Sequence, residues 1–294
     1  MKHTGRRVGV LFLLHALWAG ASHAELTGGA LPADEISRQS AIYQSRGDDV
    51  PKGYVIGRSL SSYLYVLPSG FTGSLAKLGP DDRWLDIGAG EGRAVMDYCT
   101  SKYDGTLLKG AGPRTGRKAQ AVAMSIEDRR TAQWHQTAAR LEANQLQYLF
   151  GRRLREYSPA ELGKFQVITD VMGGFSYAQD LSLFMEKALA FLDLDGSFYT
   201  VLQDVRTENT SRPYYAGSPF LTEIVGADGS EVRMCSWLKS ISCVEVTCEA
   251  KPDWSPPLEV YRIRKTCDKV EVPSLTPVHF AAGTPPERRF RLKE

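Results

Sequence analysis

The sequence predicts an α/β protein built on a doubly wound, mostly parallel sheet, and three observations lead to this fold class. A short apolar run at 83–87 ends in a glycine-rich turn and is followed by a helical pattern. Between residues 83 and 202, apolar runs of strand length alternate with amphipathic helical segments. From residue 231 onward, runs of strand length follow one another without helices between them. The alternation predicts parallel strands joined by right-handed crossovers, and the strand-only end predicts antiparallel strands at one edge of the sheet.

The chain before the sheet is predicted to be an N-terminal helical lid that covers residues 25–80. Residues 33–46 have a helical apolar pattern, whereas the pattern of residues 59–67 fits neither a helix nor a strand clearly. We expect this segment to lie over a ligand pocket of the α/β domain, which is predicted to span 81–273.

Within the α/β domain, each predicted strand is a short apolar run, as expected for strands that are buried on both faces. The five parallel strands are expected at 83–87, 119–126, 147–150, 165–170 and 196–202. Longer helices are expected at 91–102, 127–143 and 180–192. A short helix is expected to begin at Ser158-Pro159-Ala160-Glu161, which is a capping box with proline at the first helical position.

The last third of the chain is predicted to extend the sheet and then to lose order. Three strands without intervening helices are expected at 231–238, 240–249 and 258–266. They would add an antiparallel hairpin to one edge of the parallel sheet. The tail at 274–294 is expected to be disordered.

The N-terminus has the layout of a secretory signal peptide that ends at Ala24. Lys2, Arg6 and Arg7 precede a largely apolar run at 8–20, and small residues stand before the expected cut. The apolar run is short for a membrane span, although an uncleaved membrane anchor is the alternative. We therefore expect an exported protein, periplasmic or secreted, without a stable membrane anchor after the signal peptide is removed.

Removal of residues 1–24 also changes the charge balance of the chain. It takes away three of the 36 Lys and Arg residues and none of the 34 Asp and Glu residues, which leaves a net charge of −1. A near-neutral chain has no general electrostatic attraction for nucleic acids. We expect a small-molecule partner and no nucleic-acid partner.

The cysteines predict disulfides rather than a metal site. Cys235, Cys243, Cys248 and Cys267 lie in the last quarter of the chain, and their spacing differs from the paired motifs of zinc sites. In an exported protein two disulfides are the expected state, and the sequence leaves all three pairings open. Cys99 stands apart on a predicted helix and is expected in the core.

The glycine-rich turn after the first strand is the main functional signal. It reads Asp86-Ile87-Gly88-Ala89-Gly90-Glu91-Gly92, with glycines at three alternate positions. Glycine tolerates unusual backbone angles and lets a ligand approach the backbone, and the helix that follows offers unpaired N–H groups. A dinucleotide fingerprint would need a third glycine where this chain has Arg93, so that alternative is weakened. A glycine-rich turn that binds nothing is the second alternative.

This turn and two further passages make the chain similar to the class I S-adenosylmethionine-dependent methyltransferases over roughly residues 80–272. The passages at 85–92, 165–170 and 194–199 look like the family's glycine loop, fourth-strand motif and turn into strand five. The resemblance implies a Rossmann-like sheet that ends in an antiparallel hairpin. It also implies S-adenosylmethionine as the cofactor.

The resemblance assigns most of the cofactor site to two strand ends. The backbone of Gly88, Ala89 and Gly90 would face the methionine end of the cofactor, in a loop that also contains Ile87 and Gly92. Asp86 would hold the cofactor's amino group, directly or through water. Ser125 or Glu127 would hold the ribose hydroxyls, with a place in the first turn of a helix as the alternative role of Glu127.

The resemblance also points to Arg152 and Asp170. Near the adenine the family often has an acid, where this chain has Gly151-Arg152-Arg153, and arginine can stack on adenine but cannot accept its amino protons. Asp170 ends the fourth strand and is the candidate catalytic base or acceptor-orienting group. Its alternative role is to cap the Gly173-Gly174 turn.

The activity that the resemblance implies is methyl transfer from S-adenosylmethionine to a small-molecule acceptor. The sulfonium is already activated, so such an enzyme needs in-line placement of the acceptor, and a base only when the acceptor must lose a proton. Export conflicts with a cofactor that is made in the cytoplasm. The alternative is an exported, non-catalytic binding protein that retains the methyltransferase fold.

Overall fold

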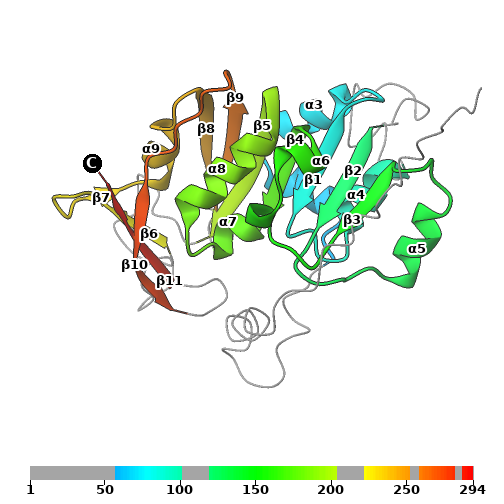
Figure 1. The fold of residues 1–294 in the computed structure, drawn as a ribbon, viewed down its shortest axis with the longest axis horizontal. Coiled ribbons are helices and arrows are strands. Elements are labelled where there is room, and N and C mark those ends of the chain that lie inside the picture. Colours follow the sequence, from blue (N-terminus) through cyan, green and yellow to red (C-terminus); the bar gives the residue numbers. More distant parts are fainter. Residues whose placement is uncertain (1–56, 101–118, 204–221, 252–257, 282–286, 294) are drawn as a thin grey trace, which may run out of the picture.

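The computed structural model describes residues 57–100, 119–203, 222–251, 258–281 and 287–293, and Figure 1 shows how they fold. The main feature is a seven-stranded sheet. Its strands, in spatial order, are β3 Leu146–Leu149, β2 Gln120–Met124, β1 Arg83–Ile87, β4 Phe165–Val171, β5 Leu192–Gln203, β9 Leu258–Lys265 and β8 Val244–Lys251. The first five are parallel, and β9 runs antiparallel to both β5 and β8. The doubly wound, mostly parallel sheet with an antiparallel hairpin is therefore confirmed.

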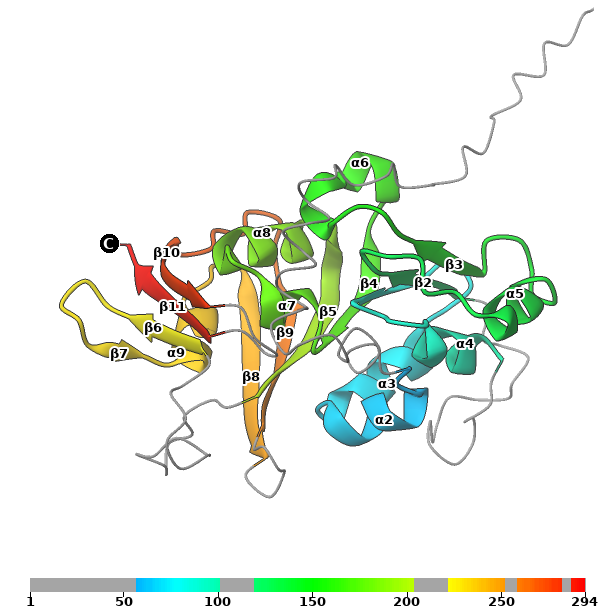
Figure 2. The same cartoon turned by 90° about the horizontal axis from the view of Figure 1, so that it is seen from below.

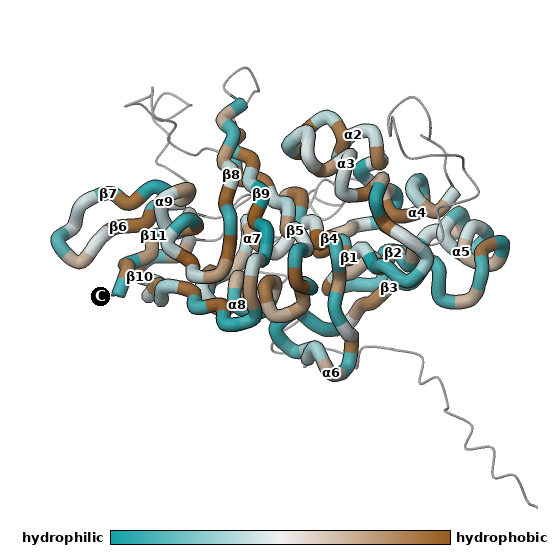
Figure 3. The backbone as a smooth tube through the Cα atoms, turned by 90° about the horizontal axis from the view of Figure 1, so that it is seen from above, coloured by the Kyte–Doolittle hydropathy of each residue, from teal (hydrophilic) through white to brown (hydrophobic). Residues whose placement is uncertain are grey.

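Helices cover both faces of this sheet (Figure 2). One face carries α2 Leu60–Val66, α3 Gly70–Lys77, α4 Arg93–Cys99 and α5 Ala132–Ala138. The other carries α6 Pro159–Leu162, α7 Gly174–Tyr177, α8 Leu181–Phe191 and α9 Met234–Lys239. Each face has its own cluster of buried apolar side chains, so the middle strands are apolar along most of their length, as the brown stretches of β4 and β5 in Figure 3 show.

The tail that was predicted to be disordered forms part of a second sheet, which corrects the expectation for 274–294. This four-stranded sheet has the order β10 Leu275–Ala281, β11 Glu287–Leu292, β6 Thr222–Val225 and β7 Glu231–Val232. Leu275 and Phe290 are almost completely buried, and β11 pairs in parallel with β6. β11 thus pairs with a strand that lies far earlier in the chain, with Arg288 in register with Thr222, and local sequence patterns do not reveal this partner.

The strand predicted at 231–238 is wrong for most of its length. Only Glu231–Val232 forms a strand, and α9 follows it directly. Met234, Trp237 and Leu238 are the buried residues of α9, at i, i+3 and i+4, which is helical rather than strand spacing.

Other boundaries shift by a few residues. α5 begins later than the predicted helix at 127–143, because Thr131 caps it by accepting a hydrogen bond from the backbone N–H of Trp134 at 3.2 Å. The segment at 59–67, which the sequence left undecided, contains α2. The helix expected at 33–46 and the signal peptide expected at 1–24 lie outside the described residues.

Two disulfides hold the antiparallel part of the protein together. Cys235 of α9 is bonded to Cys248 of β8, and Cys243, just before β8, is bonded to Cys267, just after β9. Cys99 is a buried free thiol, as expected. In the part of the chain that the structure describes, we find no helix that combines the length and the apolar character needed to cross a membrane.

Candidate functional site

Asp86 and the glycine loop that follows it lie where β1 and β4 end side by side. The order of the large sheet runs from β1 to β2 and β3 on one side and to β4 and β5 on the other, so the connections diverge at this point. In open α/β sheets, ligands bind outside the carboxyl ends of the strands at such a switch point. Ile87 of β1 lies in register with Asp170 of β4.

The glycine loop follows β1 directly, and its three glycines are required by the backbone. Gly88, Gly90 and Gly92 have φ values of 70°, 56° and 70°, the left-handed region that favours glycine. A Cβ at position 88 would lie 2.6 Å from the Cα of Gly173, and one at position 92 would overlap the ring of Trp134. The loop is therefore held closely between the turn after β4 and α5, and larger residues would push these elements apart.

Two further hydrogen bonds hold the loop in place. The backbone N–H of Ala89 donates to the carbonyl of Met124, at the end of β2, at 3.0 Å. The hydroxyl of Tyr148 donates to the carbonyl of Gly90 at 2.5 Å. Burial raises the pKa of Tyr148 to about 12, so this hydroxyl keeps its proton at neutral pH. Ile87 and Ala89 are buried, so their side chains belong to the core.

Asp86 is completely buried at the head of this loop. Its carboxylate accepts hydrogen bonds from the Thr169 hydroxyl at 2.7 Å and from the Tyr63 hydroxyl at 3.1 and 3.0 Å. Trp84 Nε1 in turn donates to the Thr169 hydroxyl oxygen at 2.8 Å, which leaves the Thr169 proton for Asp86. Burial raises the pKa of Asp86 to about 7, and the bonds from Thr169 and Tyr63 oppose that rise. Three elements, β1, β4 and α2, thus meet at one carboxylate.

Asp170 is also completely buried, on the opposite face of the sheet from Asp86. Successive strand residues point to opposite faces, and Thr169 faces Asp86. The two carboxylate oxygens of Asp170 accept hydrogen bonds from the backbone N–H groups of Gly173 at 2.9 Å and Phe175 at 3.0 Å. Burial raises its pKa to about 7, which the backbone hydrogen bonds oppose. The capping role is thus present, and the role as a base stays a prediction.

The two residues expected at the ribose lie on the β2 side of the glycine loop. Ser125 is half-buried, and its backbone N–H donates to the carbonyl of Leu149 at 2.9 Å. Glu127 is exposed and forms an ion pair with Arg129. The Tyr148 hydroxyl that holds Gly90 is also 3.4 Å from the carbonyl oxygen of Glu127, so this loop borders the glycine loop.

Arg152 is engaged with α6 and its neighbourhood. Its guanidinium forms an ion pair with Glu161 at 2.5 Å and lies 4.0 Å from the centroid of the Tyr157 ring. A second arginine, Arg130, lies beside Phe150, the residue that follows β3. Arg130 lies 4.9 Å from the centroid of the Phe150 ring and pairs with Asp128 at 2.9 and 2.8 Å.

Arg58 lies across the end of β4, in the segment that leads into α2. Its Nη1 is 3.5 Å from the carbonyl oxygen of Val171, and its Nη2 is 3.5 Å from the sulfur of Met172. The contact with the carbonyl oxygen is at the long limit for a hydrogen bond, and a thioether sulfur is a weak acceptor. Arg58 is half-buried, and its charge is close enough to lower the pKa of Asp86.

Sequence reasoning missed two of the groups that complete this site. Tyr63 was missed because residues 59–67 gave no clear pattern, although Leu60, Tyr63 and Val66 are the buried residues of α2 at every third position. Tyr148 was read only as part of a strand. Neither position carries a motif, so only the tertiary contacts identify their hydroxyls.

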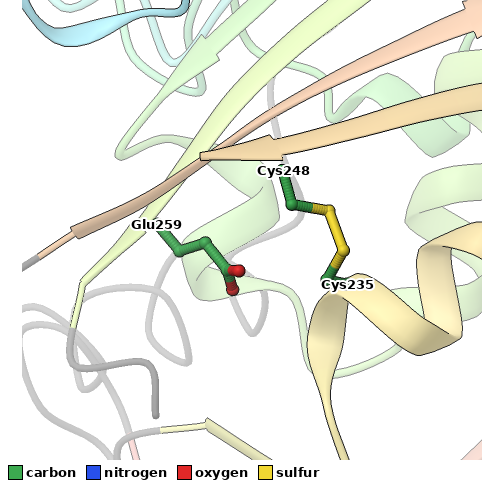
Figure 4. Close-up of side chains that lie close together, drawn as sticks. All are labelled: Cys235, Cys248 and Glu259. Atoms are coloured by element: carbon green, nitrogen blue, oxygen red, sulfur yellow. A yellow bond between two sulfur atoms is a disulfide. The ribbon is translucent and has the colours of Figure 1, made fainter. Parts of the chain in front are cut away.

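A group of possible metal ligands lies in the antiparallel part of the protein, on α9, β8 and β9. Cys235, Cys248 and Glu259 have ligand atoms within 4.8 Å of one another. Figure 4 shows that the two sulfur atoms are bonded to each other. A disulfide offers no thiolate, so this group does not form a metal site in the oxidised protein.

No protein-family model and no curated protein sequence matches the chain. Among solved structures, the 1,6-didemethyltoxoflavin-N1-methyltransferase of Burkholderia thailandensis, with bound 1,6-didemethyltoxoflavin and S-adenosylhomocysteine, is 13% identical with a TM-score of 0.44. The match covers 79% of this chain and 87% of that one. Phosphoethanolamine N-methyltransferase 2 of Haemonchus contortus, in complex with S-adenosylmethionine, is 10% identical with a TM-score of 0.45, over 78% and 60% of the two chains. YjhP of E. coli is 12% identical with a TM-score of 0.45, over 79% and 100%. At these values the likenesses carry no argument about what this chain binds.

Proposed function

We propose that this protein binds S-adenosylmethionine at the end of β1 and transfers its methyl group to a small-molecule acceptor. The observation that carries the proposal is the setting of Asp86. Its carboxylate is completely buried at the head of a loop in which Gly88, Gly90 and Gly92 all have positive φ. Ionising a buried carboxylate costs free energy, and a ligand cation that pairs with it offsets that cost. The ammonium group of S-adenosylmethionine is such a cation.

The methionine end of the cofactor is a zwitterion, so the site also needs a positive group for the carboxylate. Arg58 supports this role, because its two guanidinium contacts at 3.5 Å are with a carbonyl oxygen and a thioether, which are weak acceptors, rather than with an acid. A ligand carboxylate could take two of its N–H groups in the paired geometry that arginine favours. In this proposal Tyr63 and Thr169 orient Asp86, and the loop backbone approaches the ligand.

The ribose and the adenine are assigned to the β2 side of the loop. Ser125 and Glu127 are the proposed ribose partners, and the carboxylate of Glu127 would leave Arg129 to reach the hydroxyls. Phe150, which lies beneath Arg130, offers the adenine an aromatic face. Arg152 would first have to leave Glu161, so its role at the adenine is the weakest part of the assignment.

When bound, the cofactor supplies a methyl group that its sulfonium already activates. The residues of this chain then need only to place an acceptor in line with that group and to exclude water. Asp170 is the proposed base for an acceptor that must lose a proton, since a pKa of about 7 suits proton transfer near neutral pH. Its hydrogen bonds to Gly173 and Phe175 also shape the turn that borders the acceptor's place.

We further propose that the protein is exported. The signal-peptide pattern of residues 1–24 and the two disulfides support this, because disulfides persist in oxidising compartments. A non-catalytic exported binding protein is the second candidate. It is favoured by one observation: both oxygens of Asp170 already accept backbone hydrogen bonds, so an acceptor would compete with Gly173 and Phe175 for the proposed base.

Calorimetric titration of the oxidised chain 25–294 with S-adenosylmethionine and S-adenosylhomocysteine tests the proposal. Low-micromolar binding of both ligands is expected, followed by methyl transfer in a screen of small acceptors with labelled cofactor. Asp86→Asn should weaken binding at least tenfold, since a hydrogen bond to a charged group contributes about 1.5–3 kcal/mol. Asp195→Asn is the matched control, because Asp195 is exposed and lies on β5 beside Arg264.

The outcomes of this titration distinguish the cofactor assignment, the non-catalytic candidate and the role of Asp86. Absence of binding at millimolar ligand would overturn the cofactor assignment. Binding of both ligands without transfer to any acceptor would favour the non-catalytic candidate. Equal affinity of the Asp86→Asn and Asp195→Asn variants would show that Asp86 is not the group that holds the ammonium.

A further inference from the structure

A buried arginine connects the second sheet to the candidate site. Arg288 lies on β11, outside the seven-stranded sheet, and only 1% of its surface is exposed. In Figure 1 the second sheet lies beyond α7 and α8, at the end of the molecule opposite β3. A guanidinium is rarely buried this deeply without a structural reason, because its desolvation is costly.

The hydrogen bonds of the Arg288 guanidinium all go to backbone or side-chain oxygens. Nη1 donates to the carbonyls of Phe175 and Ala178, at 2.9 Å each. Nε and Nη2 donate to the hydroxyl oxygen of Thr222 on β6, at 3.2 and 2.9 Å. Arg288 therefore anchors one side of its guanidinium in the second sheet and uses the other side to hold α7.

α7 is the single helical turn that links Arg288 to Asp170. The N–H groups of Gly173 and Phe175, where α7 begins, hold the carboxylate of Asp170, and the carbonyls of Phe175 and Ala178 hold Arg288. A buried negative charge and a buried positive charge are thus compensated through the same turn of backbone. The charge of Arg288 also lowers the pKa of Asp170, against the rise that burial causes.

The turn at the start of α7 is in contact with the glycine loop. A Cβ on Gly173 would lie 2.6 Å from the carbonyl oxygen of Ile87 and 3.0 Å from the Cα of Gly88. If α7 moved away from Asp170, Gly173 would therefore lose its close contact with Gly88, and the glycine loop would lose its packing on this side. The path from Arg288 to Gly88 consists of hydrogen bonds and one close backbone contact.

We propose that Arg288 is a positioning residue for the cofactor site: through α7 it holds the Asp170 turn against Gly88, so the glycine loop depends on the second sheet. The proposal rests on the function proposed above for the loop. It adds that the C-terminal strands, which lie far from the loop in the sequence, are needed for cofactor binding.

A charge effect separates this role from a merely structural one. Arg288 from β11 lies on the same face of the sheet as Asp170, whereas Asp86 from β1 and Tyr63 from α2 lie on the other face and interact with Asp170 only through their charge. Tyr177 of α7 faces Arg288 itself. The positive charge of Arg288 lowers the pKa of Asp170. Replacing Arg288 by a neutral residue should therefore raise this pKa above about 7.

Two measurements on the oxidised chain test the proposal. The first is the dissociation constant of S-adenosylhomocysteine between pH 5.5 and 8.5 for the wild type, Arg288→Gln, Arg288→Lys and Arg289→Gln. The second is amide hydrogen exchange of residues 165–178 without ligand. Arg289→Gln is the matched control, because Arg289 is the next residue of β11 but is exposed and pairs with Glu223 at 2.6 Å.

We expect Arg288→Gln to weaken binding at least tenfold at pH 7, to speed exchange at residues 173–178, and to move the midpoint of the pH dependence upward. Arg288→Lys should keep the wild-type midpoint while binding is partly weakened. Arg289→Gln should match the wild type in all three respects. In the Asp170→Asn background, Arg288→Gln should produce no shift of the midpoint.

A folded Arg288→Gln protein that binds and exchanges like Arg289→Gln would overturn the proposal. If Arg288→Gln does not fold, Thr222→Val removes one anchor of the guanidinium and should give smaller changes in the same directions. If the wild type does not bind the ligand, the proposed function fails, and hydrogen exchange alone still decides whether Arg288 holds α7.

Discussion

Replacing Asp86 by asparagine should stabilise the ligand-free protein at pH 8 and at the same time weaken cofactor binding. Burial raises the pKa of Asp86 from 3.8 to about 7. Between these values the folded protein binds a proton that the unfolded chain has lost, so the free energy of unfolding falls as the pH rises through this window. A rise of about three pKa units corresponds to a fall of about 4 kcal/mol from this one group.

Asparagine has nearly the same shape and carries no charge, so the variant avoids this fall. Its amide oxygen can still accept from Thr169 and Tyr63, which now donate to the carboxylate at 2.7 and 3.1 Å. Compared with the protonated carboxyl, the amide brings one more N–H donor into the buried site, and a buried donor without an acceptor costs about 1–2 kcal/mol. We therefore expect Asp86→Asn to be more stable than the wild type by about 2–3 kcal/mol at pH 8, and less stable by about 1–2 kcal/mol at pH 4. Asp170 titrates in both proteins, so most of its contribution cancels in their difference.

Urea unfolding without reductant, followed by tryptophan fluorescence from pH 4 to pH 8, measures this difference. Asp195→Asn should stay within about 0.5 kcal/mol of the wild type, because Asp195 is exposed. Affinity for S-adenosylmethionine should rise in the wild type as the carboxylates of Asp86 and Asp170 ionise near pH 7, and should remain low in Asp86→Asn. Parallel stability curves for the wild type and Asp86→Asn would refute the reasoning, because they would show that Asp86 has an ordinary pKa in the folded protein.

Three further predictions concern the supports of the site. Gly173→Ala places a Cβ 2.6 Å from the Ile87 carbonyl oxygen and should lower both thermal stability and cofactor affinity, whereas Gly73→Ala, with no atom within 4 Å, should stabilise α3 by about 0.5–1 kcal/mol. Tyr148→Phe removes the hydrogen bond to Gly90 and should weaken cofactor binding several-fold in calorimetry, at a cost of about 1 kcal/mol; unchanged affinity would show that Gly90 needs no such support. Thiol titration of the denatured, unreduced protein should detect Cys99 alone, whereas four or five reactive thiols would contradict both disulfides. Loss of the Cys235–Cys248 bond in a double serine variant should lower the free energy of unfolding in urea by about 2–4 kcal/mol.

The parallel strands were predictable because their burial leaves a local mark. Strand β1 matches its predicted limits, and β4 differs from its prediction by a single residue. Strands covered on both faces must be apolar throughout, so a run such as 165–170 is distinctive in itself. The glycine loop was predictable for a similar reason, since positive φ at Gly88, Gly90 and Gly92 restricts those positions to glycine.

The C-terminal part was harder to predict because its elements depend on distant partners. In β11, Phe290 is buried between exposed Arg289 and Arg291, a half-buried pattern that has meaning only if β6 lies beside it. Residues 234–238 carry helical spacing, but their run of apolar residues also suited a strand. The pairing of the four cysteines likewise required the fold, because all three pairings are compatible with the sequence.

By itself, the sequence determined the parallel α/β sheet, the position of the glycine loop and the presence of an acid at its head. Tertiary structure alone decided what surrounds that acid. The hydroxyl of Tyr63 reaches Asp86 from 23 residues away, and the guanidinium of Arg288 reaches Phe175 from 113 residues away. Periodicity reports which face of an element is buried, whereas a hydrogen bond across the core depends on how separate elements pack. The environment that sets the charge state of Asp86 and Asp170 is therefore a property of the folded chain.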